Sequence, residues 1–217
     1  MVPIYFILYI FSHGLVSLSI NSNSDSFYVE VASKIVSLVH TFYICFFSYS
    51  YLLNYIPLEL FLSKLYYTRS FLIFDLILVS YFKKYFTDYL FIFFHHVSFL
   101  LCMIISSNSQ LIAQGLIAET TNFFLYTTWF LHKKKMNKGI FFKVCSILLY
   151  VSFFIFRILN FGHLLYTGVT NISSFHYFEI LSMIVIYILN LNWFRLLSVK
   201  LFQILRNKHL EKVKKLE

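Results

Sequence analysis

The sequence predicts an all-α membrane protein in which seven helices cross the bilayer. Apolar residues make up 59% of the 217-residue chain and charged residues only 12%, whereas soluble domains average about 45–50% and 25%. Apolar stretches of roughly 17 to 25 residues recur from end to end, and each can cross about 30 Å of hydrocarbon as a helix. The basic residues fall in short segments between these stretches. The net charge of +9 therefore reports topology and does not indicate a nucleic-acid-binding face.

The predicted spans follow one another with short connections. They are residues 3–20, 32–53, 69–82, 89–107, 110–131, 140–161 and 177–198. The third is short, so we expect it to be tilted or to extend a few residues further. Before it, the segment YIPLELFLSKLYY at 55–67 has apolar residues at helical spacing, and we expect a separate short helix in the outer interface.

Three regions follow from this pattern: a first span with a polar loop (1–31), one bundle (32–200) and a basic tail (201–217). If the spans alternate, Lys83 and Lys84 lie on the same side as the loop HKKKMNK and the tail. The excess of Lys and Arg predicts that this side is cytosolic. The C-terminus is then cytosolic and the N-terminus lumenal or outside.

The first span is expected to be retained, although a cleaved signal peptide is the alternative reading of residues 1–20. The segment has no basic n-region. Its removal would also invert the side predicted for every loop. The triplet Asn171-Ile-Ser173 falls in a predicted outer loop and is a candidate glycosylation site.

Polar residues inside the spans are the candidate functional residues, because ionisable groups in a bilayer cost several kcal/mol unless paired or hydrated. A rise of 1.5 Å per residue places four of them about 10 Å below the inner surface: His40, Asp75, His95 and Asn190. Asn192 lies slightly nearer the cytosol, and Glu119 lies deeper, at about 18 Å. We expect these side chains to form one polar layer.

Two polar stripes predict a polar interior shared by the fourth and fifth spans. The stripes are Asp88, His95, Ser98 and Cys102 on one span and Glu119, Asn122 and Tyr126 on the other. His96 is turned about 100° away from His95.

Acid–base or nucleophilic chemistry is what such a layer permits. His95 with Asp75 or Glu119 could deprotonate an amine or a hydroxyl group, or a histidine could itself accept an acyl group. The alternative is that these side chains only join helices, at about 0.6 kcal/mol for each hydrogen bond.

Arg157 and Glu179 are expected near the outer ends of the sixth and seventh spans, where they pair with each other or contact a lipid phosphate. No metal site is predicted. The adjacent His95 and His96 diverge around a helix, and the i, i+4 spacing of zinc-binding histidines is absent.

Six motifs in order resemble the TLC domain, which is shared by ceramide synthases, the TRAM translocon-associated proteins, the CLN-type protein and a set of small homologues. The motifs are KIVSLVH at 34–40, YYTRSFLIFD at 66–75, DYLFIFFHH at 88–96, AETTNFFLYTTWF at 118–130, FFIFRI at 153–158 and LNLNWF at 189–194. The resemblance runs from about Lys34 to the end of the seventh span.

This resemblance implies a barrel of six helices, spans two to seven, around a tunnel for acyl chains. It also implies that His95 and His96 correspond to the histidine pair of ceramide synthases, which acylate a sphingoid amine from acyl-CoA. The sequence departs from those enzymes because no aspartate stands between His96 and Glu119. The closer likeness is to the small homologues with roles in membrane lipid composition.

We therefore predict a membrane protein that binds, senses or remodels acyl lipids. The candidate lipid-binding residues are His40, Asn122, Arg157, Asn190 and Asn192. The first alternative is an N-acyltransferase with His95, His96, Asp75 and Glu119 as catalytic candidates and acyl-CoA as co-substrate. The second alternative is a structural protein without catalysis. Membrane lipids and acyl chains are the expected partners, and no cofactor or nucleic acid is expected.

The tail ends in Lys214-Lys215-Leu216-Glu217, which resembles the di-lysine retrieval signal of the endoplasmic reticulum. This likeness predicts residence in that membrane or a related endomembrane. Chance pairing of lysines in a basic tail is the alternative reading.

Overall fold

In the computed structural model, which describes residues 2–19, 25–86 and 88–213, the described chain consists of helices and short turns and contains no strand. The α-helices are α1 Val2–Ser19, α2 Asp25–Leu52, α3 Leu58–Tyr81, α4 Tyr89–Ile105, α5 Ser109–Leu116, α6 Thr121–Lys133, α7 Ile140–Phe153, α8 Asn160–Thr170 and α9 Tyr177–Val213. The shorter segments are η1 Lys83–Tyr85, η2 Ile117–Thr120, the π-helical η3 Phe154–Leu159 and η4 Ile172–Ser174. An all-helical fold is confirmed, as expected where only helices satisfy the backbone within each apolar segment.

Turn residues set the helix boundaries. Asn54 adopts a positive φ of 60° after α2, and Pro57 holds an extended conformation before α3, where its missing N–H costs no helical hydrogen bond. The side chain of Asn108 caps α5 by accepting a hydrogen bond from the Leu111 N–H at 3.0 Å.

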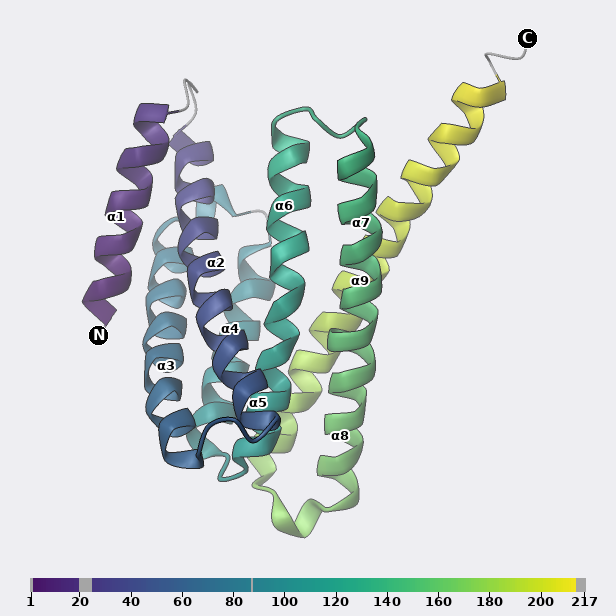
Figure 1. Cartoon of the computed structure of the whole chain (residues 1–217). Coiled ribbons are helices and arrows are strands. Elements are labelled where there is room, and N and C mark those ends of the chain that lie inside the picture. The colour runs from purple at the N-terminus through teal and green to yellow at the C-terminus, as the bar shows by residue number, and fades with distance from the viewer. Residues whose placement is uncertain (1, 20–24, 87, 214–217) are drawn as a thin grey trace.

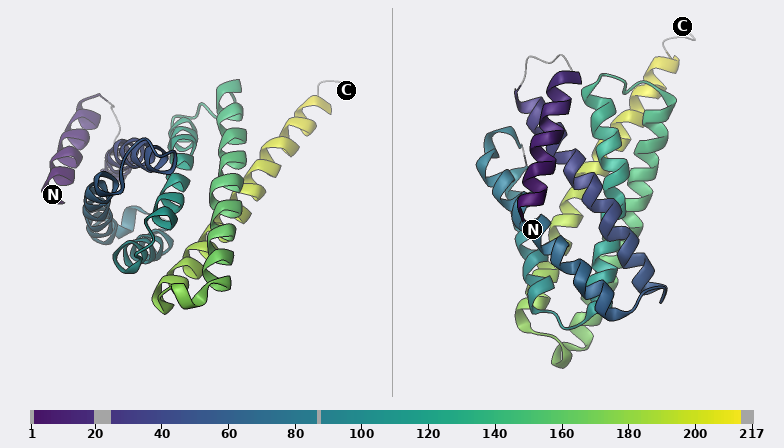
Figure 2. Two further views of the ribbon diagram at one scale, coloured as in Figure 1. Left: turned by 60° about the horizontal axis from the view of Figure 1, so that its bottom comes forward. Right: turned by 60° about the vertical axis from the view of Figure 1, so that its left-hand side comes forward.

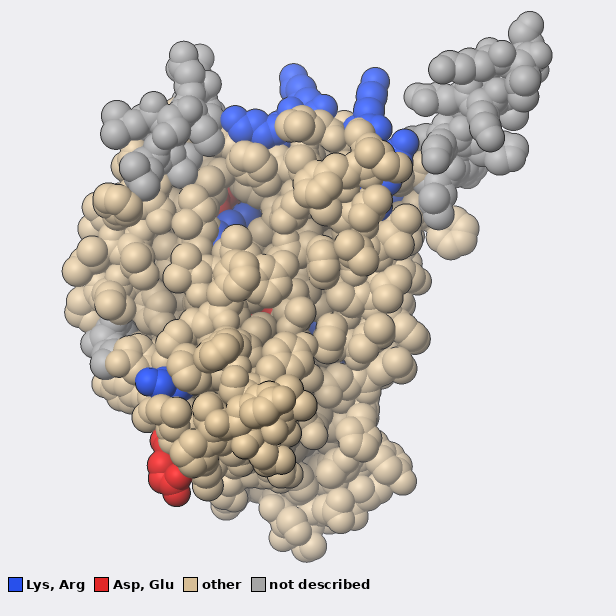
Figure 3. All heavy atoms as spheres, in the orientation of Figure 1, with Lys and Arg blue, Asp and Glu red and all other residues tan. Residues whose placement is uncertain are grey.

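The long helical segments alternate in direction, so that chain segments far apart in sequence meet at one end of the bundle (Figure 1). The loop between α6 and α7 and the C-terminal end of α9 lie at this end, together with the start of α2. Lysine and arginine side chains gather there (Figure 3). We call it the basic end.

The first helix packs on the outside of α2 and α3 (Figure 2). Its aromatic side chains interlock with those of α3. The ring centroids are 4.9 Å apart for Phe6 and Phe74 and 5.5 Å apart for Tyr5 and Phe71. Such edge-on pairs contribute beyond their buried area, so α1 is bound by packing and adds no wall to the interior described below.

Two sequence expectations about helix bounds are wrong. The separate interfacial helix at 55–67 does not exist, because residues 58–81 contain no glycine or proline and form one helix, α3. Arg69 in its middle donates to the Met103 carbonyl at 2.6 Å, so this charge is satisfied at the C-terminal end of α4. The predicted span 140–161 continues through the π-helical segment to Thr170.

Three described helical segments are long and apolar enough to cross a membrane: Phe27–Leu52, Ile140–Thr170 and Tyr177–Ile204. Tyr89–Ile105 is a shorter apolar helix. The crossing of the bilayer by all seven segments, and the six-helix barrel, stay predictions.

Candidate functional site

A cavity of about 330 Å³ lies inside the bundle, a size in the usual range of small-molecule sites. Side chains from α2, α3, α4, α6, α7 and α9 line it, with others from η2, η3 and the segment before α4. The lining residues nearest the basic end are Ser33 on α2, Trp129 on α6 and Lys200 on α9, with Asp88 immediately before α4. In Figure 3, charged atoms are visible in a recess of the surface just below the basic end. The cavity therefore runs inward from the basic end.

Both adjacent histidines line the cavity, but they face different neighbours. Nδ1 of His96 lies 3.0 Å from Oδ2 of Asp75, at an angle that does not make a hydrogen bond. His95 is buried beside Trp193, with the ring centroids 5.3 Å apart, and its Nδ1 has no hydrogen-bond partner.

Asp75 therefore lies against His96. His95 was expected to act with Asp75 or with Glu119, and the first of these two alternatives is wrong. Adjacent helical residues point about 100° apart. Because α3 and α9 both pack on α4, one histidine meets the aspartate of α3 and the other meets the tryptophan of α9.

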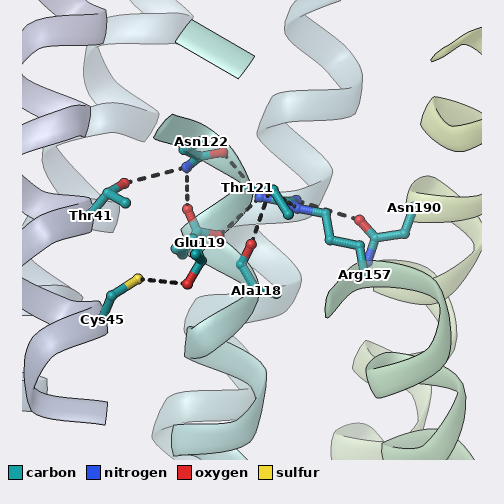
Figure 4. Close-up of polar contacts among 9 residues, drawn as sticks. Thr41, Cys45, Ala118, Glu119, Thr121, Asn122, Arg157 and Asn190 are labelled. Atoms are coloured by element: carbon teal, nitrogen blue, oxygen red, sulfur yellow. Dashed lines mark hydrogen bonds and ion pairs between the residues drawn. The ribbon is translucent and has the colours of Figure 1, made fainter. Parts of the chain in front are cut away.

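Arg157 and Glu119 line the cavity at its inner end, which we call the floor. Figure 4 shows the polar contacts of these two residues. Nη2 of Arg157 lies 3.4 Å from Glu119 Oε1 and donates to Asn122 Oδ1 at 3.2 Å. Its Nε donates to Thr121 Oγ1 at 2.8 Å, and Nη1 donates to Asn190 Oδ1 at 3.5 Å. One guanidinium therefore joins η2, α6 and α9 from the π-helical segment.

The predicted pairing of Arg157 with Glu179 is wrong. Because the sixth helical segment continues to Thr170, Arg157 lies near its middle and not at its outer end. Glu179 is buried in the first turn of α9 at the other end of the bundle, and its Oε1 has no hydrogen-bond partner. The π-helix around Arg157 is a form often found at functional sites.

The predicted stripe of the fifth span is brought together as expected, because Glu119, Asn122 and Tyr126 all line the cavity. Asn122 is hydrogen-bonded on three sides. Its amide accepts from Arg157 and donates to Glu119 and to Thr41, the last at 3.5 Å.

The remaining members of the predicted layer do not line the cavity. His40 stacks on Phe71, with centroids 4.0 Å apart, and its Nδ1 lies 3.3 Å from the hydroxyl of Tyr5. Asn190 reaches the cavity only through Arg157, and Asn192 accepts a hydrogen bond from Arg195 at 3.5 Å. Equal depth alone does not place side chains in one site, since each also needs the right direction around its helix.

The predicted glycosylation site lies away from the cavity. Asn171 is exposed after α8, at the end opposite the basic end. Lys214 and Lys215 fall outside the described residues.

Lys34 and Trp129 were not predicted as site residues. Nζ of Lys34 lies 4.3 Å from the ring centroid of Trp129 and 5.9 Å from that of Tyr126 at the mouth of the cavity. Trp129 follows Tyr126 at i+3, and this spacing on the polar face was the available signal. Within the described ranges, no group of three or more His, Cys, Asp or Glu residues is arranged to hold a metal ion.

Comparison with known families identifies one match. The family model of the TLC domain matches residues 28–199, more than half of the chain. Neither a curated protein nor a solved structure matches the sequence significantly.

Proposed function

Because the chain belongs to the TLC domain family and is an integral membrane protein, we propose that it binds acyl lipids in the cavity, in order to sense or remodel them. The observation that carries this proposal is the mixed lining of one cavity. Histidine, carboxylate and guanidinium groups stand there beside apolar residues such as Phe71, Ile92 and Leu149. A ligand that satisfies such a lining has both a polar group and a hydrocarbon part.

Burying ionisable side chains in a membrane protein costs free energy, and this cost supports a ligand-binding role for them. Asp75, His95 and Arg157 are each at least nine-tenths buried, and ionisable side chains in a membrane interior are functional by default. Arg157 and Glu119 satisfy each other. Nδ1 of His95 has no partner among the described residues, so it remains available to a bound polar group.

For orientation, we propose that the basic end faces the cytosol, following the excess of lysine in its loops. The cavity then opens to the cytosol, and Asn171 is lumenal. We further propose residence in the endoplasmic reticulum or a related endomembrane, on the basis of the Lys214-Lys215 pair in the tail.

The second candidate function is an N-acyltransferase that uses acyl-CoA. The contact between Asp75 and His96 favours it, because a carboxylate beside an imidazole stabilises the imidazolium that forms when histidine acts as a general base. The nitrogen of the amine substrate would attack the thioester carbonyl while His96 takes its proton, and the proton would pass to the departing thiolate. This reading stands second because aspartates typical of ceramide synthases are missing after His96.

Expression in cells that lack their own ceramide synthases separates these functions. Lipid profiles would be compared for wild type, His96→Ala and Asp75→Asn. The matched control is His163→Ala, which changes an exposed histidine of α8 that does not line the cavity.

New N-acyl lipids that vanish in both cavity variants, but not in the control, would establish the transferase. Altered acyl composition without new N-acyl lipids, lost only in the cavity variants, would support binding or remodelling. An unchanged lipid profile at normal expression would contradict both proposals.

A further inference from the structure

A second, smaller void of about 20 Å³ lies deeper in the bundle. All of its lining residues are apolar, including Phe99, Gly115, Phe161 and Met183. A void with no polar partner for water stays dry, so it offers space only to hydrocarbon.

Three continuous helical stretches each contribute lining residues to both the large cavity and the small void. His95 on α4, Glu119 on η2 and Arg157 on η3 line the large cavity. Four residues along the chain from each, on the side away from the basic end, lies a residue that lines the small void: Phe99 of α4, Gly115 of α5, which leads into η2, and Phe161 of α8, which continues η3. Four residues are about one helical turn, or roughly 5.4 Å, so the void lies directly below the cavity floor.

The ring of Phe99 lines the void and lies next to His95, which lines the large cavity. Its centroid is 5.7 Å from that of His95 above and 6.2 Å from that of Phe161 beside it. A Cβ at Gly115 would lie 3.4 Å from Phe99 Cζ and 3.9 Å from Phe161 Cζ, which is ordinary van der Waals contact. Even one added methyl group would therefore touch both rings.

We propose that Phe99 is a chain-length-determining residue: it closes the inner end of the lipid cavity and stops an acyl chain before it enters the apolar void. This inference rests on the proposed binding of acyl lipids. The ligand enters from the basic end, and its hydrocarbon end meets the Phe99 ring. Removal of the ring joins the two spaces and lets a longer chain enter.

The test uses the full-length protein in phosphatidylcholine nanodiscs and a series of saturated fatty acids of increasing length, each with a diazirine at the terminal carbon. Photolabelled positions are mapped by mass spectrometry, with excess unlabelled fatty acid to identify saturable sites. The variants are Phe99→Ala and the milder Phe99→Val, in case the first fails to fold. The matched control is Phe61→Ala, which removes a fully buried ring that lines neither space.

In wild type, we expect saturable labelling beside the large cavity and none at the void residues Cys102, Leu111 and Leu164. Both Phe99 variants should accept probes longer by about one helical turn, roughly 5.4 Å, and these should label the void residues. The double variant Phe99→Ala with Gly115→Leu should restore the wild-type limit, because the new side chain fills the opening.

The outcomes distinguish this inference from the function on which it rests. Saturable cavity labelling that is identical in wild type and in the Phe99 variants would overturn the role of Phe99 and leave lipid binding in place. Labelling of the void residues in wild type would do the same. The absence of saturable labelling in every variant would overturn lipid binding itself.

Discussion

Breaking the ion pair at the cavity floor should cost more stability than breaking any ion pair at the surface. The side chain of Arg157 is 6% exposed and that of Glu119 is 22% exposed. Removing one partner of a buried pair leaves the other charge without compensation, which costs about 3–5 kcal/mol. We expect Glu119→Gln to lower the free energy of unfolding by about 3 kcal/mol. This is the lower end of the range, because the new amide still accepts hydrogen bonds. Arg157→Met should cost about 4 kcal/mol, because three further acceptors lose their donor.

The double variant should be more stable than the sum of the single losses predicts, because two neutral side chains leave no buried charge. We expect a coupling energy of about 2 kcal/mol. Unfolding by denaturant in detergent micelles would be followed by tryptophan fluorescence. Both tryptophans of the chain, Trp129 and Trp193, line the cavity, so the signal reports the site itself.

The matched control is the pair of Glu30 and Lys133, 3.3 Å apart with side chains 14% and 42% exposed. Its double-variant cycle should give at most about 1 kcal/mol. Strictly additive losses at Glu119 and Arg157, or single losses no larger than those of the control pair, would refute the reasoning, since water would then be stabilising the floor charges.

Three further predictions concern other residues. A Cβ at Gly168 would lie 2.5 Å from Met183 Cε, but this methyl group is the flexible end of its side chain, so Gly168→Val should lower the free energy of unfolding by only about 1 kcal/mol. Adding Met183→Ala should reduce that loss in the same denaturation assay, and an equal loss in both backgrounds would argue against the contact. Asn171 is exposed at the end proposed to be lumenal, so a glycosidase should increase electrophoretic mobility in wild type and have no effect on Asn171→Gln. A wild-type protein insensitive to the enzyme would count against this site. Changing Lys214 and Lys215 to serine should move the protein out of the endoplasmic reticulum in fluorescence microscopy; unchanged localisation would discredit the retrieval signal.

Much of the fold was predictable because apolar length and composition constrain a membrane chain strongly. The helical runs at 32–53, 89–107 and 177–198 each fall on a helix of the structure, α2, α4 and α9. The boundaries were less predictable. The sixth span was predicted to end at residue 161. No proline lies between 161 and 170, and α8 continues to Thr170.

The candidate site was predictable in part. Helical periodicity placed Glu119, Asn122 and Tyr126 on one face, and all three line the cavity. Depth alone grouped His40 with Asp75, His95 and Asn190, but its ring is stacked on Phe71 and lies beside Tyr5 of α1. The partners of ionisable groups were the least predictable feature, because a pairing depends on the rotation of two helices about their own axes.

By itself the sequence determined that this chain is helical and membrane-embedded, which family it resembles, and which polar residues the spans must accommodate. Hydrophobic length and helical period are local properties, so they can be read along a single chain. Only the tertiary structure decided that Asp75 meets His96, that Arg157 meets Glu119, and that Phe99 lines the void beside His95. Those contacts join segments far apart in sequence, and the close packing of side chains between helices selects one set of neighbours from many that the sequence permits.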